Sequence, residues 1–118
     1  MEAYIIRLNH KFPTLNELMT VSSYHKRRKF EKSSKDAIRE ALYGYDKPEG
    51  FTIMNIEYVY SYKRRDVDNT IPAVKYFLDV LREKGWLIDD SPRYVQEVIL
   101  KFDPEIEINT QFFKLKFK

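Results

Sequence analysis

Four aspartates flank one predicted helix and are the residues of this chain best suited to chemistry. Asp66 and Asp68 precede the helical stretch, and Asp89 and Asp90 follow it. Hard divalent cations such as Mg²⁺ bind oxygen ligands, and a site with two or three carboxylates leaves coordination positions for water and a substrate phosphate. Asp66 and Asp68 are two residues apart, so in an extended segment their side chains point to one face. The pattern favours metal-dependent phosphodiester hydrolysis.

The acidic residues lie among positively charged ones. Lys63, Arg64 and Arg65 stand directly before Asp66. Residues 24–39 form a second basic block with seven Lys or Arg against two acidic residues, and its densest part is Lys26, Arg27, Arg28 and Lys29. A local excess of cations beside aromatic side chains is typical of surfaces that contact nucleic-acid phosphates. The alternative is a solvated, charged helix face.

Both acidic motifs also have a structural interpretation. A D-x-D-N string is often a turn with a helix cap, and Asn69 is a good N-cap residue. The D-D-S-P string that begins at Asp89 is a common loop composition. Carboxylates that serve only as caps do not need three cations beside them, so the combination favours the chemical interpretation.

The ordered motifs resemble the RusA family of Holliday junction resolvases, which are small Mg²⁺-dependent endonucleases of bacteria and phages. The resemblance covers residues 51–101 and is carried by R-R-D-V-D-N at 64–69, L-D-V-L at 78–81 and I-D-D-S at 88–91. A weaker likeness is F-P-T-L-N-E at residues 12–17, which is similar to a P-S-L-N motif after the first strand of many members. The ordered combination of D-x-D-N, L-D-x-L and D-D is quite specific.

The resemblance implies a site, a metal and a substrate. Asp66, Asp68 and Asp90 match the family's metal-binding aspartates, with Mg²⁺ as the expected cofactor and Mn²⁺ as a substitute. Asp89 and Asn69 are expected to support these ligands. The implied substrate is branched DNA, four-way junctions above all, held by the two basic blocks. Paired symmetric nicks in such a junction require a homodimer with two-fold symmetry.

One position departs from the best-known members. They carry a catalytically important lysine three residues after the asparagine of D-x-D-N, where this chain has Pro72. The chain also has three more residues before L-D-x-L, nearly one helical turn at ~3.6 residues per turn. The phage-type branch carries its lysine in a K-x-x-L-D pattern that residues 75–79 match, so Lys75 is the expected phosphate-binding or transition-state cation. The alternative is an ordinary ion pair with Asp79.

Length and composition limit the classes of protein to which the chain can belong. At 118 residues, the chain predicts a single domain over residues 1–118. Its 43% hydrophobic and 15% aromatic content favours a folded protein, and the absence of cysteine excludes disulfides and thiolate metal sites. Neither an apolar run near the ~20 residues of a membrane span nor a signal-peptide core is found. We therefore expect a cytoplasmic protein, bacterial or phage-encoded, without a membrane partner.

The helix between the acidic motifs needs a strand to position it. Residues 51–62 are rich in β-branched and aromatic residues and predict a central strand that delivers Asp66 just past its C-terminal end. From Asn69 the period changes to that of a helix ended by Gly85, with one apolar stripe of Ile71, Val74, Leu78 and Leu81.

The other predicted elements complete one α/β domain. They are a strand at 3–8, helices at 15–19 and from 33 or 34 to 42, a buried turn at 86–88, a strand at 94–102 and a last, edge strand at 112–117. The expected fold is a mixed sheet with helices in the order β-α-β-α-β-β.

The sequence thus favours a Mg²⁺-dependent endodeoxyribonuclease that resolves Holliday junctions or related branched DNA in recombination and repair. Two alternatives stay open. One is a non-catalytic DNA-binding module of a phage or mobile element with the same fold. The other is a small structural protein of such an element, whose acidic loop is only a cap.

Overall fold

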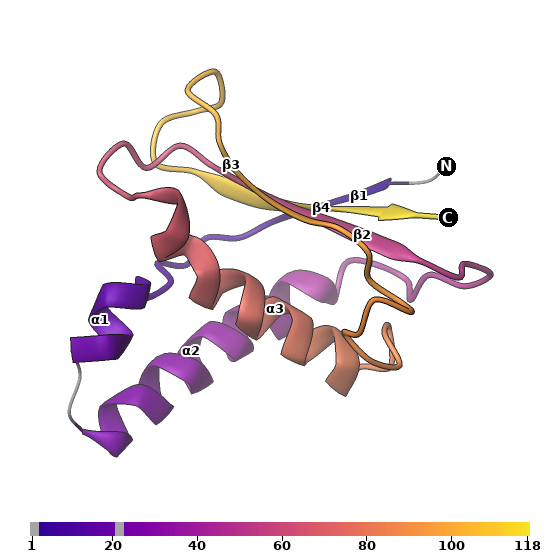
Figure 1. Ribbon diagram of the computed structural model, residues 1–118, viewed down its shortest axis with the longest axis horizontal. Helices are drawn as coiled ribbons and strands as arrows, with labels where there is room; N and C mark the ends of the chain where they lie inside the picture. Colours follow the sequence, from indigo (N-terminus) through magenta and orange to yellow (C-terminus); the bar gives the residue numbers. More distant parts are fainter. Residues whose placement is uncertain (1–2, 21–22) are drawn as a thin grey trace.

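A four-stranded mixed sheet forms the fold, with the helices on one of its faces (Figure 1). The computed structural model describes residues 3–20 and 23–118. Its elements in chain order are β1 (Ala3–Arg7), α1 (Leu15–Thr20), α2 (Tyr24–Leu42), β2 (Met54–Tyr60), the 3₁₀ turn η1 (Val67–Thr70), α3 (Ile71–Glu83), β3 (Val98–Phe102) and β4 (Gln111–Phe117). The predicted α/β class is confirmed, with α1 and α2 together in the first helical position. Within the described part of the chain, no helix combines the length and the apolar character that crossing a bilayer requires.

The strands are ordered β1-β4-β2-β3, so β2 lies inside the sheet as predicted. β4 pairs antiparallel with both β1 and β2, whereas β2 pairs parallel with β3. Met54, Ile56, Tyr58 and Tyr60 of β2 are buried, because side chains in a strand alternate between its faces and the helices cover one of them (Figure 1). On the other face only Val59 is buried as well, whereas Asn55 and Glu57 are partly exposed. β2 and β3 are both shorter than the predicted strands at 51–62 and 94–102.

The prediction of a last, edge strand is wrong, because β4 lies between β1 and β2. Phe113 and Leu115 of β4 are fully buried, whereas Lys114 and Lys116 between them are only partly buried. Apolar and basic residues therefore alternate because only one face of the sheet is covered, and not because the strand has a free edge. The free edges of the described sheet belong to β1 and β3.

α3 packs on the sheet through a face centred on Phe77. The Phe77 side chain is fully buried, and its ring stacks on Phe113 with the centroids 3.9 Å apart. Of the predicted apolar stripe, Val74 and Leu81 are buried, Leu78 is half-buried and Ile71 is 44% exposed. The prediction therefore holds for the end of α3, whereas the start of the stripe lies at the margin of the buried face and stays in contact with solvent.

Gly85 ends α3 as predicted. Its φ of +74° belongs to the left-handed region that glycine adopts without steric cost, and the next residue, Trp86, donates its N–H to the Leu81 carbonyl at 2.9 Å. Trp86 is buried, but Ile88 is 80% exposed, so the predicted buried turn at 86–88 is wrong for its last residue.

α2 begins at Tyr24, about ten residues earlier than the predicted helix. The Ser23 hydroxyl oxygen accepts a hydrogen bond from the Lys26 N–H at 3.4 Å and caps the first turn. The basic block at 24–39 therefore lies on α2. Its first turns have no apolar periodicity because their side chains are exposed, which is why the sequence pattern starts the helix too late.

A buried glutamine joins three segments of the core. Gln111 is 3% exposed, and its carbonyl oxygen accepts a hydrogen bond from the hydroxyl of Tyr58 on β2. Its side-chain NH₂ group donates to the main-chain oxygens of Leu8 and His10 just beyond β1. These bonds satisfy polar groups that water cannot reach, so Gln111 fixes the chain after β1 against the centre of the sheet.

The exchange Gln111→Leu should lower the free energy of unfolding by about 2 kcal/mol, because the Tyr58 hydroxyl and the His10 carbonyl lose their buried partner. Urea unfolding followed by circular dichroism measures this change. The chain offers a matched control in the exposed Gln96, where the same exchange should change the free energy by less than ~0.5 kcal/mol. Equal effects at the two positions would contradict the role of Gln111.

Candidate functional site

Asp66 and Asp68 stand at the C-terminal end of β2, as predicted. β2 ends at Tyr60, whose hydroxyl donates to the Arg65 carbonyl at 2.9 Å and so anchors the loop directly before Asp66. Asp66 has extended backbone angles, and its carbonyl accepts the Asn69 N–H at 3.0 Å to close the turn η1. Both carboxylates are exposed, so a ligand in solution can reach them.

The charges of both carboxylates influence the hydroxyl of Tyr60. The pKa of Tyr60 is raised, first by burial and then by the negative charge of Asp66, with a smaller contribution from Asp68, while Arg65 opposes the shift. The hydroxyl of Tyr60 at the end of β2 therefore lies within the electrostatic influence of Asp66, Asp68 and Arg65.

The turn η1 is held by α1, so two motifs that are distant in sequence meet. The side-chain oxygen of Asn69 accepts a hydrogen bond from the Asn16 N–H at 3.1 Å. In α1, the Thr14 hydroxyl accepts the Glu17 N–H at 3.0 Å, and the Glu17 carboxylate accepts the Thr14 N–H at 3.2 Å, which is a capping box. The interpretation of Asn69 as the N-cap of α3 is wrong, since Thr70 occupies that position.

A basic hollow of about 480 Å³ lies beside η1. It is lined by Lys11, Thr14, Glu17, Tyr62, Lys63, Arg64, Arg65, Asn69, Ile108 and Asn109. The predicted cations at 63–65 therefore face one concave surface together with Lys11. The sequence pattern gave no reason to add Lys11, since a single lysine before the P-T-L-N motif becomes part of the site only when α1 docks on η1.

The second basic block lies at the same end of the molecule. The start of α2, α1 and η1 all lie at the left end of Figure 1. Lys26, Arg27, Arg28 and Lys29 are exposed, and the first turn of α2 contains no acidic residue. The positive end of a helix dipole disfavours cations, so this arrangement costs stability unless an anion is bound. The end of the molecule that presents Asp66 and Asp68 is therefore suited to an anionic partner.

Asp89 and Asp90 lie at the opposite end of the molecule. They follow α3, whose 13 residues span ~20 Å from η1. The loop returns to the start of β2, where the Met54 N–H donates to the Tyr94 carbonyl at 2.8 Å. The structure therefore brings Asp66 and Asp68 together, and separates both from Asp89 and Asp90.

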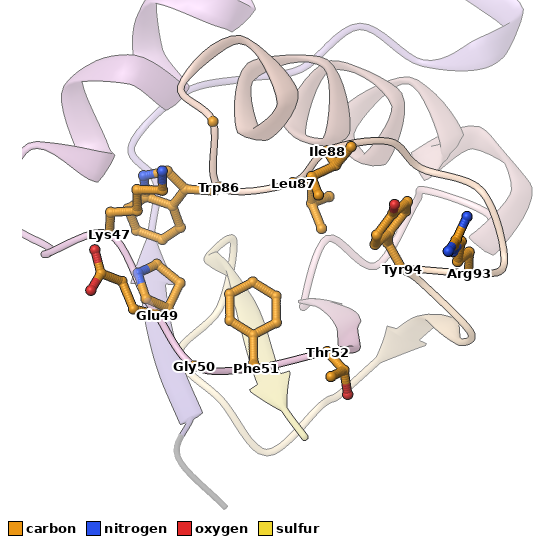
Figure 2. A pocket seen from close by; sticks show the side chains of 12 residues that line it. Lys47, Glu49, Gly50, Phe51, Thr52, Trp86, Leu87, Ile88, Arg93 and Tyr94 are labelled. Carbon is orange, nitrogen blue, oxygen red and sulfur yellow. The ribbon is translucent and has the colours of Figure 1, made fainter.

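A second hollow of about 580 Å³ is lined in part by residues 86–88, and Asp89 and Asp90 are the next residues in the chain (Figure 2). Phe51 lies in the middle of its lining, with Trp86 and Lys47 to one side and Arg93 and Tyr94 to the other. In the described ranges 3–20 and 23–118, no group of three or more Asp, Glu, His or Cys side chains is arranged to hold a metal ion. One chain alone therefore does not gather the expected ligand set.

Lys75 lies on α3 and pairs with Asp79. Its ammonium group donates to Asp79 Oδ1 at 3.1 Å, as in the alternative interpretation of this residue. Asp79 also contacts Lys35 at 3.3 Å and Arg82 at 3.1 Å, so its charge stays compensated without Lys75. The Lys75 side chain is 60% exposed and lines a groove between α3 and β3, not the basic hollow.

No model of a known protein family matches the chain, and no curated protein matches it either. The sequence motifs and the geometry of these two ends of the molecule are therefore the basis for a function.

The exchange Asn69→Ala should loosen α1 from η1, because the Asn16 N–H in the first turn of α1 loses its acceptor. Hydrogen exchange measured by NMR should show the Asn16 amide protected ~5-fold less, which corresponds to ~1 kcal/mol. The same exchange at the exposed Asn9 provides the control and should leave the Asn16 amide unchanged. Unaltered protection in the Asn69 variant would show that other contacts hold α1.

Proposed function

We propose that this protein is a Mg²⁺-dependent endodeoxyribonuclease that cleaves branched DNA, with four-way junctions as its substrate class. The observation that carries the proposal is that the exposed Asp66 and Asp68 lie beside the basic hollow. Groups that bind a hard cation are thus adjacent to groups that bind a phosphodiester backbone. The protein would act on DNA in the cytoplasm of a bacterium, during recombination and repair or during phage replication.

The oxygen atoms of Asp66 and Asp68 fit a divalent cation. Both side chains are exposed, and neither belongs to an ion pair of 4.0 Å or less among residues 3–20 and 23–118. Their lone pairs are therefore open, and two carboxylates leave coordination positions for water and substrate. A bound Mg²⁺ would lower the pKa of a coordinated water and offset charge on the scissile phosphate.

Asp90 is the third expected ligand, and we infer that a second copy of the chain supplies it. Within one chain, the whole of α3, which is ~20 Å long, lies between Asp66 and Asp90. In a two-fold dimer whose protomers lie side by side in opposite directions, the far end of one α3 comes beside the near end of the other. Each dimer then has two composite sites, one for each strand to be nicked. Asp89 would support Asp90 in this arrangement.

Cations from two segments would hold the DNA backbone. The basic hollow contributes Lys63, Arg64 and Arg65, and the start of α2 contributes residues 26–29. Lys75 could also turn to a phosphate, because its exposed i,i+4 pair with Asp79 is worth only ~0.3 kcal/mol. Backbone contacts of this kind recognise the shape of the DNA and not its sequence.

The separation of Asp90 from Asp66 within one chain also favours a second candidate, a non-catalytic DNA-binding module with the same basic end. Such a module would bind junctions through the same cations and would not need the carboxylates. The two candidates differ in what an Asp→Asn exchange does.

The first experiment compares a synthetic four-way junction with a linear duplex of the same sequence, with Mg²⁺ or with EDTA. The wild type should nick the junction symmetrically and only with Mg²⁺, and Asp68→Asn should cleave at least ~100-fold more slowly, because a metal ligand is lost. Asp46→Asn, which changes an exposed carboxylate outside the proposed ligand set, is the charge-matched control and should cleave normally. Junction binding without cleavage by the wild type would support the binding module instead.

Composite sites predict complementation between two inactive variants. When Asp68→Asn and Asp90→Asn are co-expressed, half of the dimers are mixed, and one of their two sites keeps every carboxylate. Nicking should recover to roughly a quarter of the wild-type rate, and each mixed dimer should nick only one strand. If the mixture stays as inactive as either variant alone, Asp90 does not act across a dimer.

A further inference from the structure

β3 is a free edge of the sheet and exposes apolar side chains. Val98 is 42% exposed, and Ile99 and Phe102 are each 37% exposed. Proteins usually protect such an edge with charges, bulges or a covering segment, because its unpaired main chain can pair with another strand. Three exposed apolar residues within five are therefore a reason to look for a partner.

A groove beside β3 continues the apolar surface. It has a volume of about 260 Å³ and is lined by Ile71, Val74, Lys75, Leu78, Val98 and Leu100. Ile71 is 44% exposed although it belongs to the apolar stripe of α3. The margin of α3 and the edge strand β3 thus form one continuous apolar surface along this edge of the sheet.

The main-chain groups of β3 alternate between β2 and solvent. The Ile56 N–H donates to the Glu97 carbonyl at 3.0 Å, and the Asp103 N–H donates to the Tyr60 carbonyl at 2.9 Å, so odd-numbered residues face β2. By the alternation of a strand, the N–H and C=O groups of Val98 and Leu100 point away from the sheet. Among residues 3–20 and 23–118 no strand pairs with this side of β3, so these groups can form a ladder with a further strand.

We propose that the occupant of this edge is β3 of a second copy of the chain, paired antiparallel about a two-fold axis at Ile99. In this register, Val98 lies opposite Leu100 of the partner subunit, and their outward main-chain groups form the hydrogen bonds. Ile99 meets its own counterpart on the other face of the sheet.

Charge selects this register over its neighbour. With the axis at Ile99, Glu97 lies opposite Lys101 of the partner subunit on both sides of the axis. An axis one residue further on, at Leu100, would place Glu97 opposite Asp103 of the partner subunit. Opposite charges across a ladder stabilise it and like charges destabilise it. Both Glu97 and Lys101 are exposed, and their charges are complementary in the first register alone.

The same pairing would complete the composite site, a consequence that rests on the proposed function. η1 packs against β3 of its own chain. Antiparallel pairing places the N-terminal end of the partner's β3 beside the C-terminal end of this β3, on the side of η1. The loop with Asp89 and Asp90 of the partner subunit precedes that strand, so it is carried toward Asp66 and Asp68. The interface itself depends only on the exposed side chains, main-chain groups and charges of β3, and not on nuclease activity.

The experiment uses disulfide trapping without DNA, in a chain that contains no cysteine. Residues of a non-hydrogen-bonded antiparallel pair have Cα atoms ~4.5 Å apart, within the range of a disulfide. Ile99→Cys should therefore form a covalent dimer under mild oxidation. Ile108→Cys, at a more exposed isoleucine in the loop before β4, is the control and should stay monomeric on a non-reducing gel. Equal or absent crosslinking of the two variants would overturn the interface.

Charge reversal tests the register in solution by sedimentation equilibrium. Glu97→Lys and Lys101→Glu should each raise the dimer dissociation constant by ~10-fold or more, since two attractive pairs become repulsive, and the double variant should restore it. Single reversals that leave dimerisation unchanged, or a double variant no better than either, would overturn the proposal. A dimer that passes both tests but cleaves no junction would leave this interface standing and refute the nuclease alone.

Discussion

Parallel pairing of β2 with β3 is the constraint on which the rest of the structure depends. Two parallel neighbours need a crossover, because the chain must return to the start of the sheet before the second strand begins. α3 is that crossover and runs opposite to both strands (Figure 1). Residues directly before α3 and directly after it therefore lie at opposite ends of the sheet. The candidate aspartates are divided in this way, with Asp66 and Asp68 at one end and Asp89 and Asp90 at the other.

The crossover also determines where positive charge gathers. The end of the sheet where β2 stops receives Lys11 from the segment before α1, the start of α2 and the loop 61–66, so cations from three segments converge there. Their mutual repulsion is not offset by acidic residues in the first turn of α2. The middle of α3 is different, since Asp79 contacts three neighbouring cations, and Glu31 and Glu83 pair with further groups where α2 meets α3. Charge is thus balanced where the helices pack and left unbalanced at the end that would meet DNA.

Residue types and their spacing predict most of the helices and strands. The features that they do not predict depend on contacts between segments that are distant in sequence. β2 and the end of α3 at Gly85 follow from composition and from glycine's left-handed backbone. The pattern of β4 predicts an edge strand because an alternating strand looks the same there as in the interior of a sheet with one open face. Asn69 binds the amide of Asn16, which is 53 residues away and cannot be found from a capping pattern. For the candidate site, the order of the motifs identifies the four aspartates. It does not reveal that the parallel strands β2 and β3 place Asp66 and Asp68 at the opposite end of α3 from Asp89 and Asp90.

The length of α3 has a geometric consequence. If two copies join at β3, each composite site combines the near end of one α3 with the far end of the other, so the helix sets the spacing between the two reaction centres. Every residue inserted in α3 lengthens it by ~1.5 Å, and three residues by ~4.5 Å. The number of turns in α3 would then determine the distance between the two strands that the dimer cuts in a branched substrate. Related chains with a shorter crossover helix would fit DNA whose two cut strands are closer together.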